Sequence, residues 1–178
     1  MRKLIFLFLS PFLLLAKPLF VHSGTEHVTA TTAIIPQPAT TKQVRVSDNQ
    51  EKAEELVHYA LRLQGSPYVY AGITPEGFDC SGFVTHVFGH FGVQVPHSSA
   101  MQAEVGEQVK RQQARAGDLV IFTGTNPAVR EPGHVGIVIS EPGDTITFVH
   151  ASSNGGVKVS QVEGSRYNLR FLELRRVL

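Results

Sequence analysis

The amino-acid sequence predicts one α+β domain in which helices come first and an antiparallel sheet follows. Apolar residues recur at helical spacing between residues 50 and 105, and from residue 118 the pattern changes to short β-rich runs. Pro-Gly and Asn-Gly-Gly turns separate these runs, as is typical of strands that reverse direction. The length of 178 residues, with 42% hydrophobic residues, suits a single core.

The first residues have the composition of an export signal. Arg2 and Lys3 precede a short apolar stretch, so we expect residues 1–23 to be a signal peptide that is cleaved after Ala16 or Ser23. The alternative is an uncleaved membrane anchor, although the stretch is shorter than the roughly 20 residues that span a bilayer. No Cys lies near this segment, so no lipid anchor is expected. We therefore expect an exported protein, either periplasmic or secreted.

A flexible tether is expected between the signal and the folded domain. Residues 24–49 are rich in Thr, Pro, Ala and Gln, a composition that buries too little apolar surface to offset the entropy lost on ordering. The folded domain then spans residues 50–178. Its first helix is expected to begin at an N-cap formed by Ser47 and Asp48 and to end near Gly65.

The remaining elements follow from the same periodicities. A second helix is expected from about Ser81 to Phe91, and a short helix from about Ser98 to Val105. The predicted strands are Leu119–Phe122, Val135–Ile139, Thr145–Val149, Val157–Ser160 and Phe171–Val177.

Charge and cysteine content exclude several classes of function. Lys plus Arg is 16 and Asp plus Glu is 15, so the net charge of +1 gives no field that would hold a nucleic acid at physiological salt. A single Cys excludes an internal disulfide and any site with several thiolate ligands. No metal or organic cofactor is expected. The absence of a coiled-coil pattern favours a monomer.

The single cysteine, Cys80, lies at the start of the second predicted helix. A helix N-terminus presents free N–H groups and the positive end of the dipole, which lower the pKa of a thiol and can hold an oxyanion. This placement suits a nucleophile, and the alternative of a small buried core residue stays open. At about 100° per residue, Cys80 points in the same direction as the apolar residues Phe83, Val84, Val87, Phe88 and Phe91.

A thiol nucleophile needs a base, and two His residues are placed to meet. His134 opens one predicted strand, and His150 closes the next. If these strands pair antiparallel, both imidazoles lie at one end of the sheet, where one can act as base and the other can orient it. The alternative is that both rings face solvent.

Two further His residues form a possible chelating pair. His86 and His90 lie four residues apart on the second predicted helix, a spacing that can bind a metal. They point away from Cys80 and no carboxylate accompanies them, so they are interpreted as surface residues.

Five motifs in one order carry a resemblance to a known family. The motifs are Pro67–Gly72, Phe78–Val84, Ala116–Phe122, Gly133–Ile137 and Phe148–Ala151. Through these motifs the chain resembles the NlpC-type papain-like cell-wall cysteine peptidases over nearly all of residues 50–178. The resemblance implies a permuted papain-like fold, in which a helix that bears the nucleophile packs on a central antiparallel sheet. It also implies hydrolysis of peptidoglycan stem peptides, most often between γ-D-glutamate and a diamino acid, as by a DL-endopeptidase.

The resemblance assigns a catalytic role to four residues. It implies that Cys80 is the nucleophile, that His134 is the base and later the acid, and that His150 orients His134. The Tyr68 hydroxyl would help the Cys80 backbone N–H hold the oxyanion. The alternative for Tyr68 is a core aromatic residue whose hydroxyl is hydrogen-bonded.

Substrate-binding residues are also implied, together with two departures from the family pattern. Asp79 and Ser81 would contact the stem peptide, with helix capping as the alternative, and Ser99 would bind substrate in the segment 96–99. The family usually has Arg where this chain has His97, so a fixed cation is missing or weakened near neutral pH. Ala71 stands where Gly is more usual and has less backbone freedom.

The expected function is that of a secreted peptidoglycan endopeptidase, which cuts stem-peptide or crosslink amide bonds through an acyl-enzyme. Two alternatives stay open. One is a papain-fold wall amidase or acyltransferase on the same residues. The other is a catalytically silent wall-binding module.

Overall fold

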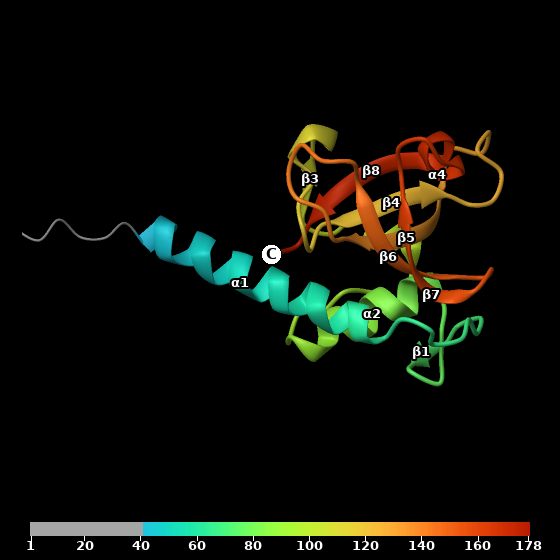
Figure 1. The fold of residues 1–178 in the computed structure, drawn as a ribbon, viewed down its shortest axis with the longest axis horizontal. Helices are drawn as coiled ribbons and strands as arrows, with labels where there is room; N and C mark the ends of the chain where they lie inside the picture. The colour runs from blue at the N-terminus through green and yellow to red at the C-terminus, as the bar shows by residue number, and fades with distance from the viewer. Residues whose placement is uncertain (1–40) are drawn as a thin grey trace, which may run out of the picture. The chain divides into compact units, whose positions relative to one another are not determined.

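The computed structural model describes residues 41–178, with side chains from Asp48 onward. The predicted signal peptide, residues 1–23, and the first part of the predicted tether, residues 24–40, lie outside the described residues. Within residues 41–178, no helix has the length and apolar character needed to cross a membrane. The elements are α1 (Thr41–Arg62), β1 (Ile73–Thr74), β2 (Gly77–Phe78), α2 (Cys80–His90), α3 (Ser99–Gln102), β3 (Glu107–Val109), the 3-10 turn η1 (Arg111–Gln113), β4 (Leu119–Thr123), β5 (Pro132–Val138), β6 (Thr147–Ser152), β7 (Gly156–Gln161), α4 (Arg166–Arg170) and β8 (Phe171–Arg176) (Figure 1).

The first helix starts earlier than the sequence pattern predicts. α1 begins at Thr41, so the predicted N-cap at Ser47 and Asp48 is wrong, and residues 41–49 of the predicted tether are helical. No Gly or Pro lies between Thr41 and the apolar face of the helix, and Ser and Asp are tolerated in a helix interior at small cost. The predicted end is confirmed, because the helix stops at Arg62 and Gly65 follows with φ +89°.

The helix that bears Cys80 is buried along the predicted face. α2 spans Cys80–His90, within one residue of the prediction at each end, and Asp79 is its N-cap. Burial of these side chains holds the helix against the sheet, with each large apolar residue contributing about 1.5–3 kcal/mol. The fully buried members of the predicted face are Phe83, Val84, Val87 and Phe88.

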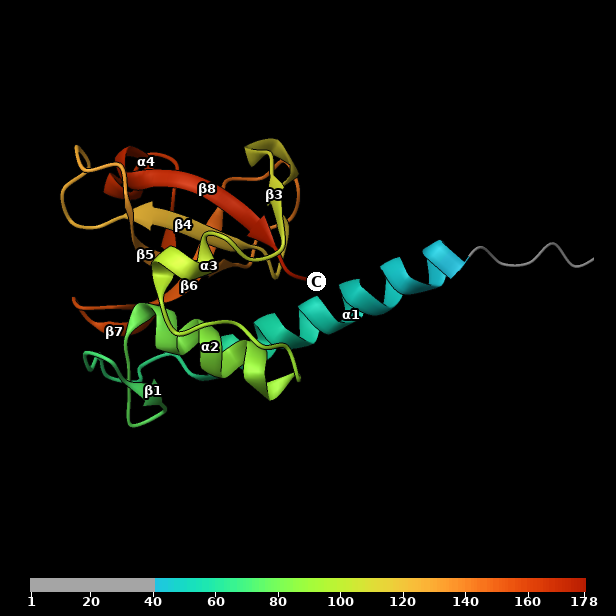
Figure 2. The same ribbon diagram turned by 180° about the vertical axis from the view of Figure 1, so that it is seen from behind.

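The sheet is antiparallel throughout, as predicted. Its strand order is β3-β8-β4-β5-β6-β7, and each strand pairs antiparallel with its neighbours. Figures 1 and 2 show α2 lying against one face of this sheet, while α4 lies at the start of β8, near β4. The α+β prediction, with a helix that carries Cys80 packed on an antiparallel sheet, is therefore confirmed.

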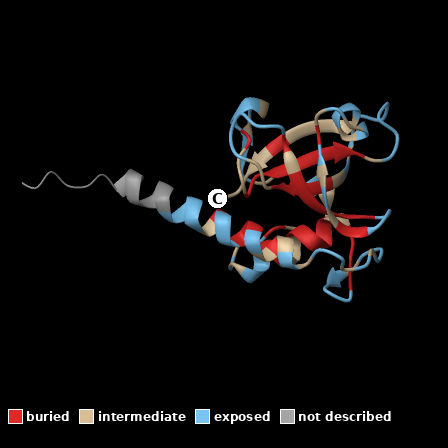
Figure 3. Ribbon diagram, viewed as in Figure 1, coloured by how far each residue is buried: buried red, intermediate tan, exposed pale blue. Residues whose placement is uncertain are grey.

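Both faces of the central strand β4 are buried, which explains its continuous apolar run. Leu119 and Ile121 belong to the core under α1 and α2, whereas Val120 and Phe122 belong to a second core on the opposite face. A strand covered on both sides does not alternate in polarity. Figure 3 shows this buried band running through the middle of the sheet.

Several short elements were not predicted. β1 and β2 form a two-residue ladder just before α2, and α4 has five residues. Elements of this length carry too few side chains to show a period. The segment before β1 contains Ala71, which has φ +58° and is the one non-glycine residue of the described chain with positive φ. The conformation that a Gly would adopt freely is thus adopted by Ala at a cost of roughly 1–2 kcal/mol.

Candidate active site

Asp79 starts the helix that presents Cys80. Its side-chain Oδ1 accepts a hydrogen bond of 2.6 Å from the backbone N–H of Gly82 and one of 3.1 Å from the Ser81 hydroxyl. This is an N-cap, which satisfies one of the free N–H groups at the start of a helix. The cap fixes the first turn of α2 and therefore the direction in which the Cys80 side chain leaves the helix.

The Cys80 thiol is half-buried, and its environment favours the protonated form. Burial is the largest influence and raises the pKa of Cys80, and the negative charge of Asp79 raises it further. Three backbone N–H groups lower the pKa of Cys80, but their effect is smaller than that of burial; they belong to Val135, Ser81 and Cys80. The expectation of a lowered thiol pKa at the helix N-terminus is therefore wrong, because desolvation exceeds the effect of the N–H groups.

The two predicted histidines meet at one end of the sheet. Strands β5 and β6 pair with Ile137 opposite Val149, which brings the start of β5 beside the end of β6. His134 Nε2 and His150 Nδ1 lie 2.8 Å apart, with the two rings nearly perpendicular at 86°. The prediction that these imidazoles come together is confirmed, and the alternative in which both face solvent is excluded.

His150 is held from its other side as well. It is fully buried, and its Nε2 lies 2.9 Å from the hydroxyl of Ser160 on β7. His134 uses its Nε2 for the contact with His150, so its other ring nitrogen, Nδ1, takes no part in the contacts that run from His134 through His150 to Ser160. This nitrogen is the atom available to accept a proton.

Both imidazoles are held neutral. Burial lowers the pKa of His134, and the positive charge of Arg170 lowers it further. Burial also lowers the pKa of His150, with smaller effects from His134, Lys158 and Arg170. A neutral imidazole is the form that acts as a general base.

The Cys80 thiol and His134 lie on elements that pack directly on each other. α2 contacts β5, and the backbone N–H of Val135, the residue after His134, acts on the thiol. No hydrogen bond joins the thiol to the His134 ring within residues 48–178. Such contacts are often long in a free enzyme and shorten in the substrate complex.

Tyr68 lies close enough to the nucleophile for their charges to interact. Burial raises the pKa of Tyr68, and the charges of Cys80 and Asp79 raise it further. Its backbone bridges to Phe78, two residues before Cys80. Tyr68 and Cys80 both pack against the core under α2, so the chain brings the two side chains to the same region.

The predicted substrate-binding residues differ in their surroundings. Asp79 and Ser81 are buried and hydrogen-bonded to each other in the cap, which is the capping alternative. Ser99 opens α3, and its backbone carbonyl accepts from Ala103. Within residues 48–178, the Ser99 hydroxyl makes no hydrogen bond to the other predicted site residues.

Sequence reasoning missed three side chains that shape the site. Ser160 ends the relay, and the hydroxyl of Tyr167 on α4 lies 3.5 Å from His150 Nε2 while its ring lies 6.0 Å from that of His134. Gln102 Nε2 donates to the Ser81 carbonyl and ties α3 to the first turn of α2. Ser160 ends a predicted strand, and the alternation of side-chain direction along that strand was the only sequence signal for any of these three residues.

The His86 and His90 pair serves a structural purpose. His86 Nε2 lies 2.9 Å from the Tyr59 hydroxyl, and the His90 ring stacks on Tyr59 at 4.0 Å between ring centres. Among the described residues, no group of three or more His, Cys, Asp or Glu side chains could hold a metal ion.

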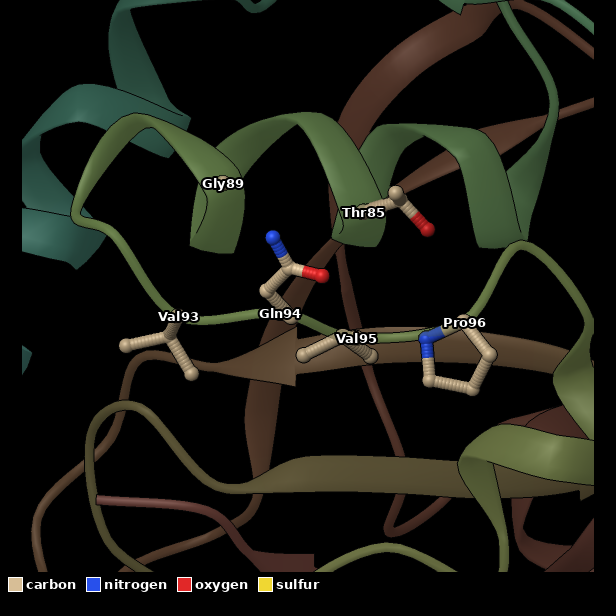
Figure 4. A pocket seen from close by; sticks show the side chains of 6 residues that line it. All are labelled: Thr85, Gly89, Val93, Gln94, Val95 and Pro96. Carbon is tan, nitrogen blue, oxygen red and sulfur yellow. The ribbon is translucent and has the colours of Figure 1, made fainter.

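A groove runs along another part of α2. Thr85 and Gly89 of α2 face the segment from Val93 to Pro96 across a hollow of about 480 Å³ (Figure 4). None of the predicted site residues lines it, so the groove is separate from the Cys80 and His134 region.

The chain is similar in sequence to known endopeptidases. Over 116 residues the chain is 40% identical to the murein DD-endopeptidase MepS/murein LD-carboxypeptidase of Escherichia coli K12, an alignment that covers 65% of this chain and 57% of that protein. Over 115 residues it is 37% identical to a probable endopeptidase of Haemophilus influenzae, covering 64% of this chain and 67% of that protein. The chain thus spans roughly three fifths of the length of these relatives.

Solved structures agree with the fold. A protein of the NlpC/P60 family from Bacillus cereus superimposes with a TM-score of 0.64 at 27% identity, covering 71% of this chain and 40% of that chain. The NlpC/p60 domain of the peptidoglycan hydrolase SagA superimposes with a TM-score of 0.58 at 28% identity, covering 70% of this chain and 97% of that domain. These likenesses confirm the predicted papain-like fold class. A sequence model of the NlpC/P60 family matches residues 65–176, and the chain therefore belongs to the NlpC/P60 family.

Proposed function

We propose that this protein is an exported peptidoglycan endopeptidase that cleaves stem-peptide or crosslink amide bonds through a cysteine acyl-enzyme. The observation that carries the proposal is the arrangement around Cys80. Its thiol lies at the N-terminus of α2 against the backbone of Val135, next to a neutral His134 that is held by the buried His150. A nucleophile, a base and a group that orients the base are the parts required for acyl transfer.

The first half-reaction forms a thioester. The Cys80 sulfur attacks the carbonyl carbon of the amide while Nδ1 of His134 takes the thiol proton. The backbone N–H of Cys80 and the Tyr68 hydroxyl hold the oxyanion. The C–N bond then breaks, and the proton on His134 moves to the departing amine.

The second half-reaction releases the enzyme. Water attacks the thioester carbon while His134 again accepts a proton, and the C–S bond breaks to leave a new carboxylate and the free thiol. His134 therefore acts as the base in both half-reactions, first toward the thiol and then toward water. His150 keeps Nδ1 of His134 pointed at the reacting atoms by holding Nε2 at 2.8 Å.

The names of several relatives describe hydrolases that act on murein peptides or on γ-DL-glutamyl bonds, and these names support the proposal. Besides the E. coli murein endopeptidase, the chain is 35% identical over 123 residues to a gamma-DL-glutamyl hydrolase of Bacillus subtilis, covering 68% of this chain and 28% of that protein. It is also 30% identical over 133 residues to a bifunctional muramidase/DL-endopeptidase of that species. These proteins act on different bonds, so the proposal covers both stem-peptide and crosslink cleavage.

Export is part of the same proposal. Residues 1–23 are proposed as the signal peptide, residues 24–40 as a tether and the rest of the chain as the catalytic part. A substrate in the cell wall requires the enzyme to cross the cytoplasmic membrane.

Mass spectrometry of the products tests the function. The protein and a Cys80→Ala variant are incubated with purified peptidoglycan in water enriched in ¹⁸O. Hydrolysis within or between stem peptides predicts fragments with one ¹⁸O in the new carboxylate and intact glycan–stem linkages, absent with the variant. Cleavage of the glycan–stem bond would indicate an amidase, products without ¹⁸O an acyltransferase, and binding without any product a silent module; each would overturn the proposal.

A further inference from the structure

Tyr167 lies against both imidazoles of the candidate active site. Its ring centre is 6.0 Å from that of His134, with 25° between the ring planes, and 5.3 Å from that of His150. Its hydroxyl lies 3.5 Å from Nε2 of His150, the same nitrogen that the Ser160 hydroxyl contacts at 2.9 Å. Two hydroxyls from different elements, α4 and β7, thus face one nitrogen of the buried histidine.

Two arginines hold the short helix that carries Tyr167. Arg170 donates from Nε at 3.3 Å and from Nη2 at 2.9 Å to the carbonyl of Thr123, the last residue of β4. The same guanidinium lies over the Tyr167 ring, 5.2 Å from its centre. Arg130 donates to the carbonyl of Leu169 at 3.0 Å from the loop that follows β4. The position of α4 beside the two imidazoles is therefore fixed by contacts with its backbone and with β4.

Aromatic packing holds the Tyr167 ring itself. Its centre lies 5.1 Å from that of Phe122 and 5.0 Å from that of Phe148, and both of these residues are fully buried. Aromatic rings at such distances attract each other in tilted and edge-to-face arrangements. The hydroxyl that faces His150 therefore belongs to a side chain with little freedom to move.

The direction of the hydrogen bonds decides whether His134 can act as a base. A neutral imidazole carries one proton. If Nε2 of His150 donates, its Nδ1 accepts from Nε2 of His134, and Nδ1 of His134 carries no proton. In the opposite direction, Nδ1 of His134 carries the proton and cannot accept one. The contacts at Nε2 of His150 therefore determine which nitrogen of His134 is free.

Two hydroxyls at Nε2 of His150 favour the first direction. One N–H group can be shared between two oxygen acceptors, whereas the single lone pair of a ring nitrogen accepts one hydrogen bond. With Ser160 at 2.9 Å and Tyr167 at 3.5 Å, an N–H on His150 Nε2 has two acceptors, and a bare nitrogen could use only one of the two hydroxyls.

We propose that Tyr167 is a positioning residue that acts with Ser160 to keep Nε2 of His150 a donor, and thereby keeps Nδ1 of His134 free to act as the base. The inference rests on the proposed role of His134. It adds to the proposed mechanism a helix that carries none of the predicted catalytic residues.

NMR of the imidazole nitrogens tests the inference without any substrate. The full-length protein with ¹⁵N-labelled histidine is compared with Ser160→Ala, Tyr167→Phe and the double variant, and His134→Gln identifies the signals of His134. We expect His134 in the wild type to carry its proton on Nε2 alone, and the double variant to contain both tautomers. A proton on Nδ1 in the wild type, or the Nε2–H tautomer alone in the double variant, would overturn the inference.

Kinetics on a muropeptide provide the second test. Ser160→Ala and Tyr167→Phe should each lower kcat by about 2- to 10-fold with KM unchanged, which is the effect of one hydrogen bond between neutral groups. The double variant should lose more than the product of these two factors, because neither hydroxyl remains to compensate for the other. An unchanged kcat in the double variant, or an effect on KM alone, would contradict the positioning role.

Tyr59→Phe is the matched control, because it removes another tyrosine hydroxyl that lies 2.9 Å from a histidine nitrogen, Nε2 of His86. It should leave kcat and the His134 tautomer unchanged. A fall in kcat equal to that of Tyr167→Phe would assign the effect to stability alone and overturn the positioning role. If the wild type cleaves no peptidoglycan while the double variant still changes the tautomer, the proposed function fails and the link between Tyr167 and His134 stands.

Discussion

Replacing His150 with Ala removes a buried imidazole that orients the proposed base. In the folded protein its Nδ1 lies 2.8 Å from His134 Nε2, and its Nε2 lies 2.9 Å from the Ser160 hydroxyl. Without His150, the His134 ring is free to rotate about its side-chain torsions, and Nδ1 no longer faces the thiol. His150→Asn keeps a carbonyl oxygen near the position of Nδ1, so it can still accept a hydrogen bond from His134.

The two variants have different expected costs. His150→Ala loses two hydrogen bonds worth about 1 kcal/mol each and leaves a cavity in place of a fully buried ring, so its free energy of unfolding should fall by roughly 3 kcal/mol. A domain with an ordinary stability of about 5–15 kcal/mol remains folded after this loss. Misplacement of a catalytic group by about 1 Å costs on the order of 100-fold in rate, which is the expected fall in kcat. His150→Asn should stay within about tenfold of wild type.

Steady-state cleavage of a purified muropeptide measures this effect, with urea unfolding as the check on folding. We expect kcat to decrease in the order wild type, His150→Asn, His150→Ala, with KM little changed, since His150 is fully buried behind His134. Equal kcat for wild type and His150→Ala, or a lower value for Asn than for Ala, would refute the orienting role.

Three further predictions concern stability. Ala71→Gly should raise the free energy of unfolding by about 0.5–1 kcal/mol, because it relieves a positive φ of 58° at an exposed residue. Asp118→Ala should lower the free energy of unfolding by about 3 kcal/mol. The substitution removes a buried carboxylate that binds the Arg176 guanidinium at 2.8 Å, and it leaves this guanidinium without its partner. The free energy of unfolding should also fall as the pH is lowered from 7 to 5.5. The pKa values of His134 and His150 are lowered in the folded protein, so below the ordinary His pKa the unfolded chain binds more protons than the folded chain does.

Urea unfolding checks all three, each with its own control. Gly65→Ala is matched to Ala71→Gly, because φ is +89° there and no atom lies near the added Cβ, and it should lose about 1 kcal/mol. A gain for both variants would contradict the argument from φ. A loss for Asp118→Ala below 1 kcal/mol, or equal stability at pH 7 and 5.5, would contradict the other two predictions. His150→Asn should remove part of the pH dependence.

The parts of the site that the sequence predicts are those determined by local pattern. His134 and His150 stand at opposite ends of two apolar runs joined by one short turn, so antiparallel pairing was enough to bring them together. Cys80 shares the direction of the buried α2 face, which four fully buried residues confirm. In each case a period of 2 or 3.6 determines where the side chain points.

Contacts between distant segments were beyond the reach of the pattern. His97 meets Asp79 across 18 residues, and Tyr167 approaches His150 from a helix of only five residues. Neither contact produces a periodic signal. The net direction of the Cys80 pKa also depends on burial, which tertiary packing determines.

Boundaries were predicted least well where polar residues are compatible with more than one structure. Ser47 and Asp48 are good N-cap residues, yet they lie inside α1, because the residues before them also favour a helix. Thr123 and Pro132 extend β4 and β5 beyond their apolar runs, since strand pairing continues after the hydrophobic pattern stops.

Hydrolysis of peptidoglycan by the Cys80 thiol is tested by comparing three proteins. The wild-type protein, Cys80→Ala and His134→Ala are assayed on the same purified peptidoglycan, with circular dichroism and urea unfolding to show that all three are folded. We expect release of soluble stem-peptide fragments by wild type alone, with the rates of both variants reduced by at least about 1000-fold. Fragment release by folded Cys80→Ala at the wild-type rate would contradict it.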